Sequence, residues 1–116
     1  MKITGLQIRE FEDRGYLVLP GLLSVEEVAK LQAALPDVFA RQGPEIVRET
    51  DDSEAIRLAF GAHTYSEPFR RLSLLPRLID PVRQLLGDEV YLHQSRLNPK
   101  QGFGHGAAWD WHQDYP

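Results

Sequence analysis

The order in which its hydrophobic patterns follow one another constrains the fold of this chain most. Apolar residues recur at helical spacing in several stretches as far as Leu86, whereas strand-like stretches gather after Val90. Helices followed by strands are typical of α+β domains. The length of 116 residues is that of one domain. We therefore predict a single α+β domain over residues 1–116, with a sheet that has barely begun where the sequence ends.

Helix signals are clear in three stretches. Gln7–Arg14 is a short amphipathic segment followed by Gly15, a residue that commonly ends helices in the left-handed conformation. Ser24 and Glu27 have the spacing of a capping box in front of a longer helical pattern. The stretch 66–86 predicts two further short helices.

Proline and the extended patterns set the remaining boundaries. Pro36 lies inside the second helical pattern, so we expect that helix to end or kink near Leu35, because proline removes a helical hydrogen bond. The polar stretch 41–54 predicts a loop. The predicted strands are Tyr16–Leu19, Ile56–Phe60, Val90–Leu97 and a segment that includes Trp109, Trp111 and His112.

Charge and composition exclude several classes of partner. The net charge of -4 and the isoelectric point near 5.5 disfavour nucleic acid and anionic membranes as partners. The chain has no cysteine, which excludes disulfides, thiolate metal sites and a cysteine nucleophile. No stretch has the length and apolar character of a membrane span or signal peptide. We expect a cytoplasmic protein with a small-molecule substrate.

The sequence His112-Gln113-Asp114 carries the clearest chemical signal. Residues two apart on an extended strand point to the same face, so His112 and Asp114 are expected to lie together. An imidazole and a carboxylate are two of the three ligands of the 2-His-1-carboxylate site of non-haem Fe(II) oxygenases. The alternative is a polar, solvated strand face with Trp109 and Trp111 packed into a core behind it.

Longer motifs make the signal more specific. The sequences YLHQSRLNPK (Tyr91–Lys100) and WDWHQDY (Trp109–Tyr115), in that order and separation, resemble the two site-bearing strands of the phytanoyl-CoA dioxygenase family. Phe11–Ser24, Arg77–Ile79 and Gln84–Gly87 resemble earlier parts of the same family. The likeness is greatest to its ectoine hydroxylase-like bacterial members, and the chain resembles the N-terminal part of the family's domain.

The resemblance implies a fold, two cofactors and several site residues. It implies the first strands of a double-stranded β-helix (a jelly-roll, cupin-like fold), Fe(II), and 2-oxoglutarate as co-substrate. His112 and Asp114 match the family's iron ligands, Lys100 the residue that contacts 2-oxoglutarate, and Gln94 a residue that contacts substrate.

Strand alternation adds two residues to this set. Asn98 and Arg96 share the predicted strand face of Gln94, which makes Asn98 a candidate co-substrate neighbour and Arg96 a candidate substrate contact. Because this face is polar and arginine can bind a carboxylate in bidentate fashion, we expect a small, amino-acid-like metabolite as substrate. The alternative for Arg96 is an internal ion pair with an acidic neighbour such as Asp110.

The chain also departs from the family pattern. Gln113 and Tyr115 stand where ectoine hydroxylases tend to have Ser and Phe, which weakens the case for ectoine as substrate. The family's second iron-binding histidine lies further downstream than Pro116, so we expect a truncated dioxygenase. The alternatives are a catalytically inactive remnant that serves as a binding or assembly module, as a homo-oligomer or with a completing chain, and a metal-free jelly-roll binding protein.

Overall fold

The fold is known from a computed structural model, in which residues 2–50, 54–100 and 110–114 are described. Helices and a small antiparallel sheet together confirm the predicted α+β class. The elements of this described part are α1 (Gly5–Arg14), α2 (Val25–Phe39), β1 (Ile46–Arg48), β2 (Ile56–Phe60), α3 (Ala62–Tyr65), α4 (Glu67–Ser73), α5 (Pro76–Leu86) and β3 (Arg96–Leu97).

The helix ends follow local capping chemistry. Ser24 Oγ accepts a hydrogen bond from the Glu27 backbone N–H at 3.1 Å, and the Glu27 carboxylate accepts one from the Ser24 N–H at 2.8 Å. This confirms the predicted capping box. Gly15 and Gly87 close α1 and α5 with φ of 82° and 70°, a backbone conformation that costs glycine little.

Of the two outcomes expected at Pro36, an end or a kink, the first is wrong: helix α2 does not end there. The helix continues to Phe39, and the Ala40 N–H still donates to the Pro36 carbonyl at 3.0 Å. Proline deletes only its own N–H from the ladder. The last turn places Val38 in the core with 2% of its surface exposed, and this burial offsets the missing bond.

The sheet has the order β1-β2-β3, with β2 in the centre and antiparallel to both neighbours. The prediction of β2 is confirmed. Strand β1 was missed, because it lies in the polar stretch predicted as a loop and is stabilised by pairing with β2. Of the predicted strand Val90–Leu97, only Arg96–Leu97 is paired.

Two other strand predictions fail among the described residues. Tyr16–Leu19 is irregular, and Tyr16 and Val18 are exposed, because no described strand lies beside this segment to complete its hydrogen bonds. Residues 110–114 are likewise unpaired, and Trp111 is fully exposed instead of packed in a core. Trp109 lies outside the described residues.

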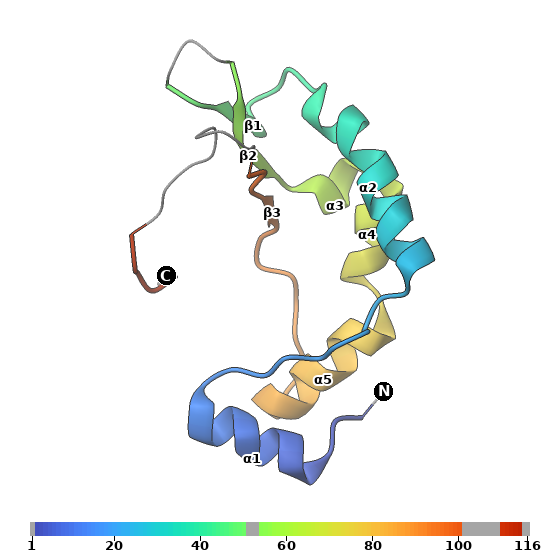
Figure 1. Cartoon of the computed structure of the whole chain (residues 1–116), viewed down its shortest axis with the longest axis vertical. Coiled ribbons are helices and arrows are strands. Elements are labelled where there is room, and N and C mark those ends of the chain that lie inside the picture. Colours follow the sequence, from blue (N-terminus) through green and yellow to red (C-terminus); the bar gives the residue numbers. More distant parts are fainter. Residues whose placement is uncertain (1, 51–53, 101–109, 115–116) are drawn as a thin grey trace.

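A small core lies where α2 and α3 meet the sheet. Val38 of α2, Ala59 of β2 and Ala62 of α3 are buried together. The partly buried side chains that pack against them are those of Phe39, Ile46, Tyr65, Phe69 and Leu97. Figure 1 shows this region toward one end of the molecule and helices α1 and α5 toward the other end.

Polar contacts connect these two ends. Arg77 of α5 donates a hydrogen bond to the Leu22 carbonyl at 2.8 Å and forms a bidentate ion pair with Glu27 of α2. Within the end that holds α1 and α5, the Gln84 amide exchanges two hydrogen bonds of 2.9 Å with the backbone of Ile3, which holds the residues before α1 on α5.

The chain is more open than a compact domain of its size. Its accessible surface is 8994 Å², whereas a compact monomer of 13.2 kDa exposes about 6,400 Å². Its radius of gyration is 16.4 Å, against about 13 Å for a compact chain of this length. None of the helices in the described part of the chain has the length and apolar character needed to cross a membrane.

Candidate functional site

The side chains of His112 and Asp114 come together as the spacing predicts. His112 Nε2 lies 3.1 Å from Asp114 Oδ1. On the other side of the ring, Nδ1 lies 2.7 Å from the Asp110 carbonyl oxygen. Because a carbonyl only accepts hydrogen bonds, Nδ1 must carry the proton. This contact fixes the ring so that Nε2 faces the carboxylate.

An imidazole nitrogen and a carboxylate oxygen, such as His112 Nε2 and Asp114 Oδ1, are atoms that divalent metal ions bind. Adjacent ligands with metal bonds of about 2.0–2.2 Å lie about 3 Å apart when they meet at a right angle, which is close to the observed separation. A metal-binding histidine usually donates its other N–H to a carbonyl or carboxylate, as His112 does toward Asp110. The same 3.1 Å is also the length of a direct hydrogen bond between the two side chains, so the geometry allows a pair of metal ligands without showing one.

The same contacts favour the protonated imidazole while no metal is bound. The pKa of His112 is raised, first by the hydrogen bond to the Asp110 carbonyl and then by the negative charge of Asp114, while the positive charge of Arg96 opposes the shift. Because a proton and a metal ion compete for Nε2, a raised pKa makes metal binding at His112 more sensitive to low pH.

Arg96 completes the cluster from the edge strand β3. Its Nη2 lies 3.6 Å from Asp114 Oδ2, an ion pair that joins two segments 18 residues apart. The internal ion pair considered from the sequence therefore exists, but its partner is Asp114 and not Asp110. A hollow of about 240 Å³ opens at this cluster, lined by Leu58, Arg96, Asn98 and His112.

The other predicted site residues lie outside the lining of this hollow. Gln94 and Lys100 are exposed and flank the side chains of Arg96 and Asn98 along the chain. The described residues contain no group of three or more side chains of the metal-binding types histidine, cysteine, aspartate and glutamate that could together hold an ion. Within this part of the chain, the structure thus brings together two of the predicted ligands, His112 and Asp114.

One contact near the site was not assigned from the sequence. His63 of α3 places Nδ1 2.7 Å from Ser95 Oγ, and the Gly61 N–H donates to the Ser95 carbonyl at 3.0 Å. These bonds hold the residue that precedes β3 against the end of β2. No local pattern signals such a contact, because its partners are 32 residues apart.

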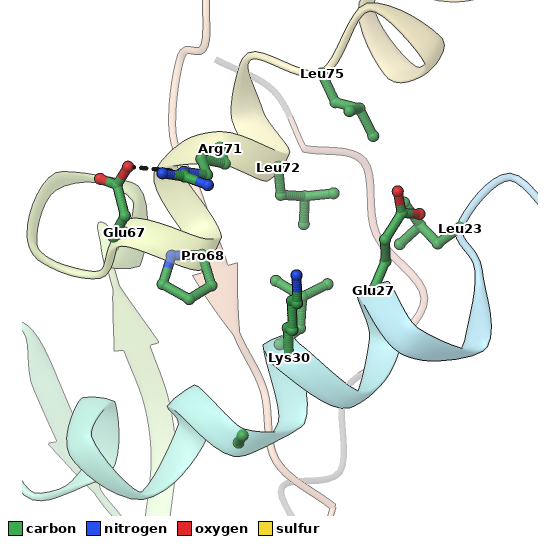
Figure 2. A pocket seen from close by; sticks show the side chains of 10 residues that line it. Leu23, Glu27, Lys30, Glu67, Pro68, Arg71, Leu72 and Leu75 are labelled. Atoms are coloured by element: carbon green, nitrogen blue, oxygen red, sulfur yellow. Dashed lines mark hydrogen bonds and ion pairs between the residues drawn. The ribbon is translucent and has the colours of Figure 1, made fainter.

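A larger hollow, of about 620 Å³, lies between α2 and α4 (Figure 2). It shares no lining residue with the hollow at His112. Its walls are mostly apolar, and the charges at its rim are largely paired, as in the 2.9 Å contact between Glu67 and Arg71. The residues that line it are Leu23, Glu27, Lys30, Leu31, Ala33, Glu67, Pro68, Arg71, Leu72 and Leu75.

Comparisons of the sequence with known proteins agree with one another. The sequence model of the family Phytanoyl-CoA dioxygenase (PhyH) matches residues 11–116. An L-proline trans-4-hydroxylase from Streptomyces griseoviridis is 43% identical over 101 residues, which are 87% of this chain and 37% of the relative. An ectoine dioxygenase from Sphingopyxis alaskensis is 44% identical over 117 residues, with 97% of this chain and 38% of the relative covered.

Solved structures agree with these matches. The crystal structure of EctD from S. alaskensis with bound Fe superposes with a TM-score of 0.87 at 43% identity, covering 97% of this chain and 41% of that one. The structure of the same protein with 2-oxoglutarate and 5-hydroxyectoine gives a TM-score of 0.75, with 83% and 35% covered. The chain spans about two fifths of the length of the relatives that it matches.

Proposed function

The chain belongs to the phytanoyl-CoA dioxygenase family, and we propose that it forms part of an Fe(II)- and 2-oxoglutarate-dependent hydroxylase of small, amino-acid-like metabolites. The observation that carries the proposal is that two atoms able to bind a metal, His112 Nε2 and Asp114 Oδ1, lie 3.1 Å apart inside the matched region. In this proposal residues 1–116 belong to one double-stranded β-helix domain.

The proposed ligands of the iron are His112 and Asp114. When bound, ferrous iron would supply the activation of O₂ and 2-oxoglutarate that hydroxylation of a C–H bond requires. The chain's own contribution is orientation: the Asp110 carbonyl holds the proton of His112 on Nδ1, so that Nε2 can serve as a ligand when it is unprotonated. Two protein ligands leave several metal positions for small molecules.

Lys100 and Asn98 are the proposed contacts of 2-oxoglutarate. Asn98 lines the hollow beside His112, which supports a position next to a metal-bound co-substrate. Lys100, two residues further along the chain, supplies a mobile positive charge for a dicarboxylate. A lysine at such a position would bind one carboxylate group through a charge-assisted hydrogen bond.

Gln94 and Arg96 are the proposed contacts of the substrate. Only part of the guanidinium of Arg96 faces Asp114, so its remaining N–H groups can bind a substrate carboxylate. The relatives support a small polar substrate, since two of them are named for L-proline and ectoine. A site built to bind polar groups rejects analogues that leave those groups unpaired.

The test is substrate-dependent formation of succinate from 2-oxoglutarate in the presence of Fe(II). We would assay the 116-residue chain and any longer product of its gene with free amino acids, ectoine-like solutes and acyl thioesters. Turnover with the first two classes supports the proposal. Turnover confined to the thioesters would contradict the substrate assignment. If replacing His112 did not change metal binding, the metal site would be contradicted. With two described ligands, we expect slow turnover by the 116-residue chain alone.

A second candidate function is that of an assembly module without catalysis. It is favoured by the sheet: strands β1 and β3 are its two edges in the described part of the chain, and sheet edges can pair with another chain. A self-associating chain that binds no metal in sedimentation and titration experiments would favour this candidate over the hydroxylase.

A further inference from the structure

The two carboxylate oxygens of Asp114 face different partners. Oδ1 lies 3.1 Å from His112 Nε2, whereas Oδ2 lies 3.6 Å from Arg96 Nη2. One carboxylate oxygen thus faces His112, with which a metal would be held, and the other faces the positive charge of Arg96.

Arg96 reaches Asp114 from a better supported part of the chain. Arg96 pairs with Phe60 across the sheet, and its neighbour Leu97 pairs with Ala59, which is fully buried. Asp114 lies in an exposed segment with no described strand partner. Of the two residues, Arg96 therefore has the more fixed backbone, and its guanidinium can hold the carboxylate in place.

We propose that Arg96 is a positioning residue that holds Oδ2 of Asp114, so that the carboxylate binds the metal through Oδ1 alone. This inference rests on the proposed function. A carboxylate that binds through one oxygen occupies one coordination position, whereas a chelating carboxylate occupies two. Arg96 thus keeps open a position that a co-substrate needs.

The positive charge of Arg96 makes this role testable. A positive charge beside the ligand repels a divalent cation, so Arg96 should weaken metal binding even as it orients the carboxylate. Replacing Arg96 with Gln removes the charge and releases Oδ2. Both changes favour tighter binding, with Asp114 as a chelate.

We would titrate the chain with Zn²⁺, up to millimolar concentrations, by calorimetry at low ionic strength. Because exposed ion pairs contribute up to about 1 kcal/mol, we expect Arg96→Gln to bind Zn²⁺ about two- to fivefold more tightly. The gain should shrink in concentrated salt, which screens the charge. Arg96→Lys keeps the charge and should not show this gain.

A spectroscopic readout separates positioning from charge alone. In protein labelled with ¹³C at the aspartate carboxyl carbons, the Zn²⁺-induced infrared difference spectrum reports the spacing between the two carboxylate stretches. We expect a wide spacing, typical of binding through one oxygen, in the wild type and a narrower one in Arg96→Gln. Without metal, Asp114→Asn should shift the Nε resonance of Arg96 in ¹⁵N spectra.

Two variants serve as controls. Arg9→Gln removes the same charge from an exposed position on α1 and should leave both the affinity and the infrared spectrum unchanged. His112→Ala defines the part of the binding that belongs to this site. Equal affinities and spectra for the wild type and Arg96→Gln would overturn the role of Arg96 alone. If the wild type and His112→Ala bound Zn²⁺ equally, the metal site would be overturned, and the role of Arg96 with it.

Discussion

The core at α2, β2 and α3 and the segment 110–114 place their residues in opposite surroundings. In the core, Val38 and Ala59 expose 2% and 0% of their surface. In the segment, Asp114 exposes 71% of its side chain and meets other groups only through polar contacts in the described part of the chain. Apolar burial stabilises the first region, while directional contacts arrange the second.

The contrast shows that stability and chemistry are separated along this chain. Burial is insensitive to direction, so the core forms although the strands of the described sheet are short. A metal site depends on the position of single atoms, and the proposed site would depend on the orientation of the His112 ring and on the ion pair between Arg96 and Asp114. Substitutions in the core should therefore leave metal binding largely unchanged, and substitutions in the segment 110–114 should leave the stability of the fold largely unchanged.

Asp114→Ala should have the largest effect, and only on the site. Loss of one of two adjacent ligands should weaken divalent metal binding by more than about a hundredfold, since even an outer contact of a ligand is worth about ten- to a hundredfold. The denaturation midpoint in urea should not fall. Asp110→Ala is the matched control, because it removes the same charge but keeps the carbonyl that orients His112. Equal losses in the two variants would show a charge effect without coordination.

Lys100→Ala should weaken binding of 2-oxoglutarate to the metal-loaded protein. Loss of one charge-assisted contact with a carboxylate corresponds to about ten- to a hundredfold in affinity. Lys30→Ala, at the separate hollow between α2 and α4, is the control and should change nothing. Calorimetric titration with 2-oxoglutarate measures both. An unchanged affinity in Lys100→Ala would assign Lys100 to the solvated surface.

Val38→Ala should affect stability and not metal binding. Removing two buried methyl groups and leaving a cavity should lower the free energy of unfolding by about 1.5–3 kcal/mol. Val25→Ala on the same helix is the control, because Val25 is 82% exposed, and its effect should stay within about 0.5 kcal/mol. Urea denaturation followed by circular dichroism distinguishes the two. Similar losses would contradict the placement of Val38 in the core.

Arg77→Gln should destabilise the connection between α5 and α2 more than a typical surface substitution does. It removes the donor to the Leu22 carbonyl and the partner of Glu27, which also caps α2. Arg71→Gln is the control, since Glu67 keeps its bonds to Arg70 when Arg71 is replaced. Thermal unfolding should show a lower midpoint for Arg77→Gln than for the control. The reverse order would contradict this role of Arg77.

Glu67→Gln should have the smallest effect, one that depends on pH. Hydrogen bonds from Arg70 and then Arg71 lower the pKa of Glu67 to about 2, from 4.5. A depressed folded-state pKa contributes stability above pH 4.5 that is lost as the pH falls toward 2. Unfolding midpoints of wild type and Glu67→Gln should therefore differ slightly at pH 6 and converge near pH 2. A difference that persists at pH 2 would show that the charge of Glu67 is not responsible.

Sequence patterns predicted the features that short-range interactions produce. The capping box of Ser24 and Glu27 and the glycine at the end of α1 involve residues only a few positions apart. The approach of His112 to Asp114 needs only two residues, and it occurs although the segment forms no described strand. In such cases the physical cause lies within the segment, so the sequence suffices to determine it.

Tertiary structure alone decided which extended segments pair and which charges meet. Tyr16–Leu19 has the composition of a strand but no neighbour, whereas polar Ile46–Arg48 forms β1 because β2 lies beside it. Arg96 pairs with Asp114, 18 residues away, whereas the sequence alone equally allowed Asp110. A strand's hydrogen bonds and an ion pair are completed by partners distant in the chain, so the position of the partner, which no local pattern contains, determines the outcome.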